Sequence, residues 1–199
     1  MKSADHIGVV VLAAGASSRL GEPKQLAPFR GKPLLQHVLD QARRLPFAAS
    51  VLVLGASADR IRKAIDFGGF FVAFNENWEE GIAGSIRKGL DDSLTIRPEL
   101  EHVLFLLSDQ PLVSGELLLD LAAAHLQKGK KITACRYGDT VGVPSIFSKS
   151  LFPELLLLEG DRGAGSLIKQ YPDDLTAVPF EPASIDVDTP EDYRKLLLL

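Results

Sequence analysis

Residues 12–24 are the segment of this sequence best suited to chemistry. They read LAAGASSRLGEPK and directly follow the apolar run 7–11, which predicts a buried strand that opens into a loop. Small side chains let backbone N–H groups close around anionic oxygens, and Arg19 and Lys24 would neutralise the negative charge that remains. The segment therefore predicts a loop that binds a polyphosphate.

Two familiar phosphate loops do not match this segment. A Walker A loop requires G-x-x-x-x-G-K-[ST], but Gly15 and Gly21 are too far apart and no lysine directly follows Gly21. The dinucleotide fingerprint G-x-G-x-x-G requires three glycines, and only two are present. An ordinary strand-to-helix turn remains the alternative interpretation.

A carboxylate follows a second apolar run. Asp109 lies just beyond residues 103–107, and Pro111 fixes the turn after it. An aspartate at this place is well positioned to hold Mg²⁺, which prefers oxygen ligands and often takes only one or two from the protein. The alternative is a cap on the next helix, a role for which Ser114 is better placed.

Two more carboxylates lie near the end of the chain. Asp186 and Asp188 flank Val187 in a predicted strand over 184–187. Alternate residues of a strand share a face, so both could point to one side and one could complete a magnesium site. Because Pro190 and the acids after it are typical of a helix start, Asp188 or Thr189 could instead cap that helix.

The sequence does not support nucleophilic or zinc chemistry. The single cysteine, Cys135, lies in an apolar run, which favours a buried structural thiol and excludes an internal disulfide. The four histidines show neither H-x-H nor H-E-x-x-H spacing, so we expect no zinc site. Phosphoryl and nucleotidyl transfer need mainly positioning and charge neutralisation, and the sequence is compatible with that reaction class.

Strand-like and helix-like patterns alternate along the chain. The predicted strands cover 7–12, 50–54, 70–74, 102–107, 175–178 and two joined stretches within 133–147, and the predicted helices cover 33–44, 57–65, 84–90, 114–127, 148–157, 165–170 and 190–198. This alternation predicts a single-domain α/β protein over residues 1–199, a Rossmann-like three-layer sandwich with a mostly parallel sheet. Ligands of such sheets bind beyond the carboxyl ends of the strands, where Ala13, Asn75 and Ser108 stand.

Composition narrows the possible partners. The 199 residues are 46% hydrophobic with a net charge of −4, which indicates a globular protein and argues against a general nucleic-acid binder. The leucine runs 155–158 and 196–199 are too short to span a bilayer, so we expect no membrane association. The first residues lack the apolar stretch of a signal peptide, and we therefore expect a cytoplasmic protein.

The pattern L-A-A-G-x-S-x-R-x-G-x-x-K of residues 12–24 resembles that of the MobA-like nucleotidyltransferases, and within them the molybdenum cofactor cytidylyltransferases. Further segments follow in the family's order: GIAGSI at 81–86, LSDQP at 107–111, GDRG at 160–163 and DVDTPED at 186–192. The resemblance covers nearly the whole chain, and the first and third motifs are specific in combination. It implies the fold of the nucleotide-diphospho-sugar transferases.

The resemblance also implies roles for particular residues. Arg19 and Lys24 would bind the triphosphate and act in catalysis with Asp109, which would hold Mg²⁺ together with Asp188 or, alternatively, Asp186. On the acceptor side of the cleft it places Asp161 and Arg162. The implied nucleotide contacts are Leu12, Ala13, Ala14, Gly15, Ser17, Arg19, Lys24, Asn75, Gly84, Ser85 and Asp109. From the residues alone, Ser85 is expected to cap a helix.

The function implied by the resemblance is the Mg²⁺-dependent transfer of CMP from CTP to the terminal phosphate of molybdopterin, with release of pyrophosphate. Related guanylyl enzymes tend to carry glycine where this chain has Ala14, and the added methyl narrows the space for a purine. Two alternatives keep the reaction but change a substrate: another nucleoside triphosphate as donor, or another acceptor such as methylerythritol phosphate or a sugar phosphate. Two others change the class of protein: a non-catalytic cofactor-delivery protein in transient contact with molybdoenzyme maturation proteins, or a Rossmann-type oxidoreductase.

Overall fold

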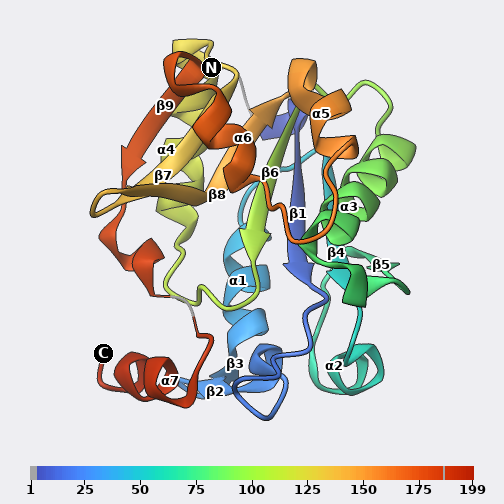
Figure 1. The fold of residues 1–199 in the computed structure, drawn as a ribbon, viewed down its shortest axis with the longest axis vertical. Helices are drawn as coiled ribbons and strands as arrows, with labels where there is room; N and C mark the ends of the chain where they lie inside the picture. The colour runs from blue at the N-terminus through green and yellow to red at the C-terminus, as the bar shows by residue number, and fades with distance from the viewer. Residues whose placement is uncertain (1–3, 186) are drawn as a thin grey trace.

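The apolar runs of the sequence form the strands of one sheet (Figure 1). The computed structural model describes residues 4–185 and 187–199. The strands of the sheet are β1 (Ile7–Ala13), β4 (Ala49–Leu54), β5 (Phe71–Phe74), β6 (His102–Leu107), β7 (Ile132–Tyr137), β8 (Thr140–Ser148) and β9 (Leu175–Pro179). They lie in the order β5-β4-β1-β6-β8-β7-β9, so the two most apolar runs, β1 and β6, pair at the centre.

The sheet is parallel except for β8. Strand β8 runs antiparallel to both of its neighbours, β6 and β7, whereas every other neighbouring pair is parallel. The chain places β4 and β5 on one side of β1 and then crosses to place β6 on the other. The carboxyl ends of β1 and β6 therefore meet at a topological switch point, the place where open α/β sheets bind ligands.

Helices cover both faces of the sheet, which confirms the predicted α/β sandwich (Figure 1). Strand β1 contributes Val9 and Val11 to one core and Val10 and Leu12 to the other, as a strand buried on both faces must. The helices that pack on the first face are α1 (Leu34–Ala42), α2 (Ala58–Ala64) and α4 (Gly115–Lys128), and those on the second are α3 (Ile82–Ile96), α5 (Phe152–Leu156) and α6 (Gly165–Gln170).

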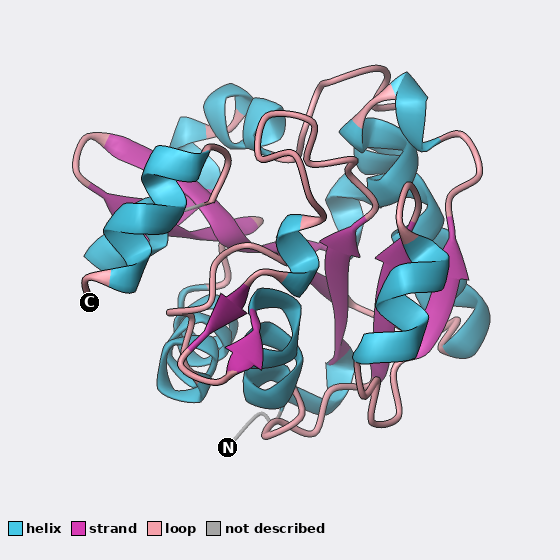
Figure 2. Ribbon diagram, turned by 90° about the horizontal axis from the view of Figure 1, so that it is seen from below, coloured by secondary structure: helices cyan, strands magenta, loops and turns pink. Residues whose placement is uncertain are grey.

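A third, smaller cluster joins the end of the chain to its beginning. Helix α7 (Pro190–Leu197) packs through Leu196 against a hairpin of β2 (Pro28–Phe29) and β3 (Lys32–Pro33), which the sequence patterns did not predict. The Tyr193 hydroxyl donates a hydrogen bond to the Pro28 carbonyl at 2.6 Å. Figure 2, seen from below, looks onto this edge of the molecule. The contact brings the segment before α7 to the loop that follows β1.

Short 3₁₀ helices complete the structure and correct one prediction. They cover Ala4–His6, Lys24–Leu26, Trp78–Glu80, Lys149–Leu151, Pro172–Asp174 and Glu181–Ser184. The strand expected over 184–187 is wrong, because Ser184 ends a 3₁₀ turn and neither Ile185 nor Val187 lies in a strand. Pro182 in the first turn favours the helical geometry and cannot donate to a sheet. Asp186 lies outside the described residues.

Ser114 and Thr189 cap the helices that follow them. The side chains of Ser114 and Thr189 accept hydrogen bonds from the backbone N–H groups of Leu117 and Asp192. Ser57 precedes α2, but its side chain makes no capping bond. Among the described residues, every helix is too short or too polar to cross a membrane.

A buried histidine, His125, is expected to make the stability of the fold depend on pH. His125 of α4 is 2% exposed, and its ring nitrogens lie 3.0 Å from Thr133 Oγ1 and from His102 Nδ1. Burial, with a smaller contribution from the neighbouring His102, lowers the pKa of His125 to about 4. Between this value and the ordinary pKa near 6.5, the unfolded chain binds a proton that the folded chain does not.

We therefore expect the free energy of unfolding to fall as the pH drops from about 6.5 to about 4, by up to about 3 kcal/mol from this side chain. Urea unfolding at pH 7 and at pH 4.5 measures the effect. His125→Gln should reduce the loss, whereas His6→Gln, at an exposed site, should not. An equal loss in the wild type and His125→Gln would contradict the assignment.

Candidate active site

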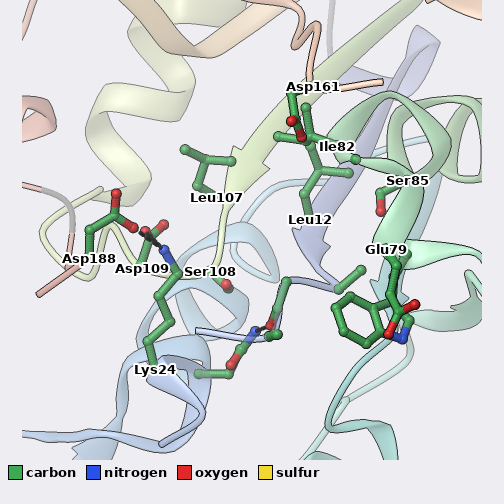
Figure 3. Close-up of a pocket in the computed structure, with 16 residues that line it drawn as sticks. Leu12, Lys24, Glu79, Ile82, Ser85, Leu107, Ser108, Asp109, Asp161 and Asp188 are labelled. Atoms are coloured by element: carbon green, nitrogen blue, oxygen red, sulfur yellow. Dashed lines mark hydrogen bonds and ion pairs between the residues drawn. The ribbon is translucent and has the colours of Figure 1, made fainter. Parts of the chain in front are cut away.

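A cavity of about 420 Å³ opens at the carboxyl edge of the sheet (Figure 3). Its walls come from the segments that follow β1 and β6, from the start of α3, and from two positions late in the chain. The lining residues are Leu12, Ala14, Gly15, Ala16, Lys24, Gln25, Trp78, Glu79, Gly81, Ile82, Ser85, Leu107, Ser108, Asp109, Asp161 and Asp188. The cavity thus lies at the switch point that the topology indicates.

Lys24 lies between two carboxylates on one side of the cavity (Figure 3). Its Nζ is 2.5 Å from Asp109 Oδ2 and 2.7 Å from Asp188 Oδ1. Burial alone would lower the pKa of Lys24, but the charges and hydrogen bonds of Asp109 and Asp188 outweigh it and hold that pKa above its ordinary value. The ammonium therefore stays protonated throughout the neutral range.

Arg19 adds a second cation at the rim. Its guanidinium donates to Asp188 Oδ2 at 2.6 Å, and its side chain is 68% exposed. Partial burial acts to raise the pKa of Asp188, but Lys24 and Arg19 together hold it below the ordinary value. Arg19 does not line the cavity, although it reaches the same carboxylate as Lys24.

The two aspartates are positioned by different local structures. Asp109 follows β6 and is 4% exposed, and since Ser114 caps α4, the Asp109 carboxylate is left for Lys24. Asp188 stands between Val187, which is fully buried in the third cluster, and Thr189, which caps α7. The capping alternative for Asp188 is thus wrong, because Thr189 takes that role.

The residues after β1 form a loop of small side chains, as the sequence predicted. Ser17 has a φ of +56°, and its Oγ accepts a hydrogen bond from the Lys24 backbone N–H at 3.0 Å. Ala13 ends β1, and Leu12, Ala14 and Gly15 line the cavity. The loop therefore folds back so that Lys24 reaches the cavity.

On the opposite side, the start of α3 forms a wall. This helix begins at Ile82 with Gly81 as its N-terminal flanking residue, so the expectation that Ser85 caps a helix is wrong. Ser85 lies inside α3, where its Oγ accepts a hydrogen bond from Asn75 Nδ2 at 3.0 Å. Ser85 lines the cavity, whereas Asn75 and Gly84 stand behind it: a Cβ on Gly84 would lie 3.2 Å from Asn75 Nδ2.

The 160–163 loop closes the cavity at the start of α3. The Gly160 carbonyl accepts a hydrogen bond from the Ala83 N–H at 3.1 Å, and a Cβ on Gly81 would lie only 2.3 Å from that carbonyl oxygen. The Asp161 side chain lies above Leu12 and Ile82 in Figure 3. Arg162 is exposed and does not line the cavity, so its contact with the acceptor stays a prediction.

Several residues that line the cavity were not predicted from the sequence. Gln25 directly follows Lys24, which was predicted to bind phosphate, and is 1% exposed. Its burial would have indicated a role in the site, but burial cannot be read from the sequence. Trp78 and Glu79 come shortly after β5, in a segment without a motif. Leu107 begins the motif LSDQP but was not proposed as a contact, whereas Ser108 lines the cavity at the strand end where the sequence analysis placed it.

The two aspartates fit a hard divalent cation. Their carboxylate oxygens converge on the single point now held by Lys24 Nζ, and carboxylates are the ligands that Mg²⁺ and Mn²⁺ prefer. No group of three His, Cys, Asp or Glu side chains in the described residues is arranged to hold a metal. The donor set is thus typical of a cation that completes its coordination with phosphate and water.

The sequence pattern of the MobA-like NTP transferase domain matches residues 9–175. This chain belongs to the MobA-like NTP transferase family. The matched residues include the loop after β1, Asp109, the start of α3 and the 160–163 loop, so most of the cavity lies within the family's domain. The chain is accordingly a nucleotidyltransferase.

Relatives of this MobA-like protein carry different names. Nicotine blue oxidoreductase of Paenarthrobacter nicotinovorans is 30% identical over 199 aligned residues, which cover 94% of this chain and 95% of that one. The structure of Rv0371c from Mycobacterium tuberculosis H37Rv is 37% identical with a TM-score of 0.86, covering 97% of each chain. A manganese complex of Rv0371c is 34% identical with a TM-score of 0.81, covering 96% of this chain and 98% of that one.

A more distant structure shares the fold. Molybdopterin-guanine dinucleotide biosynthesis protein A from Archaeoglobus fulgidus is 18% identical with a TM-score of 0.71, and the match covers 96% of this MobA-like chain and 97% of that one. At this identity the likeness concerns the architecture.

Proposed function

We propose that the protein transfers CMP from CTP to the terminal phosphate of molybdopterin, with Mg²⁺ as its cation. The observation that carries the proposal is the convergence of Lys24, Asp109 and Asp188 in a cavity beside a loop of small residues. Family membership supports the reaction class, and the sequence resemblance supports the choice of CTP and of molybdopterin.

In the reaction that we propose, an oxygen of the acceptor's phosphate monoester attacks the α-phosphorus of CTP. The bond from the α-phosphorus to the bridging oxygen of the β-phosphate breaks, and pyrophosphate leaves. The attacking oxygen is already anionic near neutral pH, so no side chain has to remove a proton. Lys24 and Arg19 would neutralise charge on the phosphates and on the leaving group. Mg²⁺ held by Asp109 and Asp188 would supply further charge stabilisation to the phosphates.

The wall around Ala14 supports a pyrimidine. The Ala14 methyl is buried beside Gly55 and Trp78: a Cβ placed on Gly55 would lie 2.9 Å from the Ala14 methyl and 2.8 Å from Trp78 Cβ. The methyl therefore has little room to move aside for a larger base. A difference of one methyl group discriminates between ligands by about 1–3 kcal/mol, enough to favour CTP over GTP.

The name of the Paenarthrobacter relative favours one competing function, an oxidoreductase. In that case a nicotinamide cofactor would stabilise the protein and CTP would not. Three further functions would keep the cavity and change its use. They are transfer to methylerythritol phosphate or to a sugar phosphate, transfer from a different nucleoside triphosphate, and delivery of molybdenum cofactor without chemistry.

A thermal-shift screen with CTP, GTP, ATP, UTP and NADPH, each with and without Mg²⁺, tests the proposal. We expect the largest stabilisation from CTP with Mg²⁺. Pyrophosphate release in the presence of molybdopterin, methylerythritol phosphate or a sugar 1-phosphate then identifies the acceptor. Stabilisation by NADPH alone would overturn the proposal, CTP binding without turnover would favour a delivery protein, and release with another phosphate would replace molybdopterin.

A further inference from the structure

A buried glutamine holds the loop that follows β1. Gln25 is 1% exposed and directly follows Lys24 in the turn Lys24–Leu26. Its side-chain Nε2 donates to the carbonyl oxygens of Ala13 at 3.0 Å and of Gly15 at 3.1 Å. Both hydrogens of the amide group are therefore used on two carbonyls of the same loop.

These two bonds fix the direction of the neighbouring N–H groups. In a trans peptide, the carbonyl of one residue and the N–H of the next point in opposite directions. By holding the carbonyls of Ala13 and Gly15, Gln25 orients the N–H groups of Ala14 and Ala16. In the described part of the chain neither N–H has an acceptor, and both alanines line the cavity with Lys24.

A second tie closes the loop on the same glutamine. Ser17 Oγ accepts the Lys24 backbone N–H at 3.0 Å and lies 3.5 Å from Gln25 Oε1. The left-handed backbone of Ser17, with a φ of +56°, turns the chain so that these groups meet. The loop is thus held by side-chain contacts before any ligand arrives, and an oriented set of donors needs little reorganisation to bind an anion.

We propose that Gln25 is a positioning residue that aims the N–H groups of Ala14 and Ala16 at the phosphate chain of the nucleotide. This inference rests on the proposed nucleotide site, but it depends neither on the base nor on the acceptor. In this role Gln25 raises the affinity of the loop for the polyphosphate through its hydrogen bonds to the Ala13 and Gly15 carbonyls and its contact with Ser17.

Two variants separate this role from simple packing. Gln25→Met keeps the length of the side chain but removes the donors, and Gln25→Glu keeps the shape but sets a carboxylate against two carbonyls. We expect the affinity for tripolyphosphate and for CTP, measured by calorimetry with Mg²⁺, to fall about tenfold in Gln25→Met and further in Gln25→Glu. The affinity for cytidine should change little. If packing alone mattered, Gln25→Glu would resemble the wild type.

Ser93→Ala serves as the stability control, because it also removes a buried hydrogen bond, from Ser93 Oγ to the Gly89 carbonyl, but away from the loop. Amide exchange of a peptide covering residues 12–18 should accelerate in Gln25→Met and not in Ser93→Ala. Unchanged tripolyphosphate affinity in both Gln25 variants would overturn the inference. A wild-type protein that binds neither CTP nor tripolyphosphate would instead overturn the proposed function.

Discussion

Asp109→Asn should slow nucleotidyl transfer by about a hundredfold to a thousandfold, measured as pyrophosphate release at saturating CTP and Mg²⁺. The substitution keeps the volume of a side chain that is 4% exposed, but it removes the charge that faces Lys24 at 2.5 Å. A neutral amide is a poor ligand for a hard cation, so the Mg²⁺ concentration at half-maximal rate should also rise.

The Asp109→Asn variant should remain folded, because Lys24 keeps its ion pair with Asp188 at 2.7 Å and is not left as an isolated buried charge. Its thermal midpoint should therefore stay within a few degrees of the wild type. Asp120→Asn, at an exposed position of α4, is the matched control and should change neither rate nor midpoint. A folded Asp109→Asn protein with a near-normal rate would refute the assignment of Asp109 to the metal.

The central strands could be predicted because each is marked by its own continuous run of apolar residues. Residues 7–11 and 103–107 are almost wholly apolar, and such runs are typical of strands covered on both faces. The structure begins β1 at Ile7 and ends β6 at Leu107, as the patterns predicted. The placement of Asp109 beside the loop after β1 follows from this pairing, since parallel neighbours end at the same edge.

The route by which Asp188 reaches the cavity could not be read from local patterns. The alternation argument required a strand over 184–187, and the structure has none at its described positions. Asp188 instead lies just before α7, and α7 docks on the β2–β3 hairpin, more than 150 residues earlier in the chain. This contact brings Asp188 to the cavity. Such a contact depends on tertiary packing between segments that are each too short to have a strong periodic signal.

The buried hydrogen bond between Asn75 and Ser85 behind the cavity wall could not be predicted from the sequence either. Ser85 has the residue type and position of a helix cap, but α3 begins about one turn earlier, at Ile82 after Gly81, whose φ is +107°. That shift places the Ser85 hydroxyl against Asn75 rather than at the helix end. Glycine spacing alone cannot distinguish these two registers, because Gly81 and Gly84 both suit a helix start.

Lys24→Met should have two opposite effects, a large loss of catalysis and a gain in affinity for a divalent cation. Removing the ammonium from the proposed phosphate site should lower the rate of pyrophosphate release by at least about a hundredfold. The same ammonium lies between the Asp109 and Asp188 carboxylates, where its charge opposes a second cation. Without nucleotide, the affinity for Mn²⁺, measured by electron paramagnetic resonance, should therefore rise about tenfold.

Two controls isolate these effects. Lys32→Met removes a lysine that pairs with Asp40 of α1 at 2.6 Å, away from the cavity. Cys135→Ala removes a fully buried thiol of β7, whose pKa is raised by burial to about 12. Neither should alter the rate by more than about twofold or change Mn²⁺ affinity. If Lys24→Met bound Mn²⁺ no better than the wild type, the Asp109 and Asp188 carboxylates would not form the metal site. If Cys135→Ala lost more activity than Lys24→Met, the loop after β1 would not be the phosphate site.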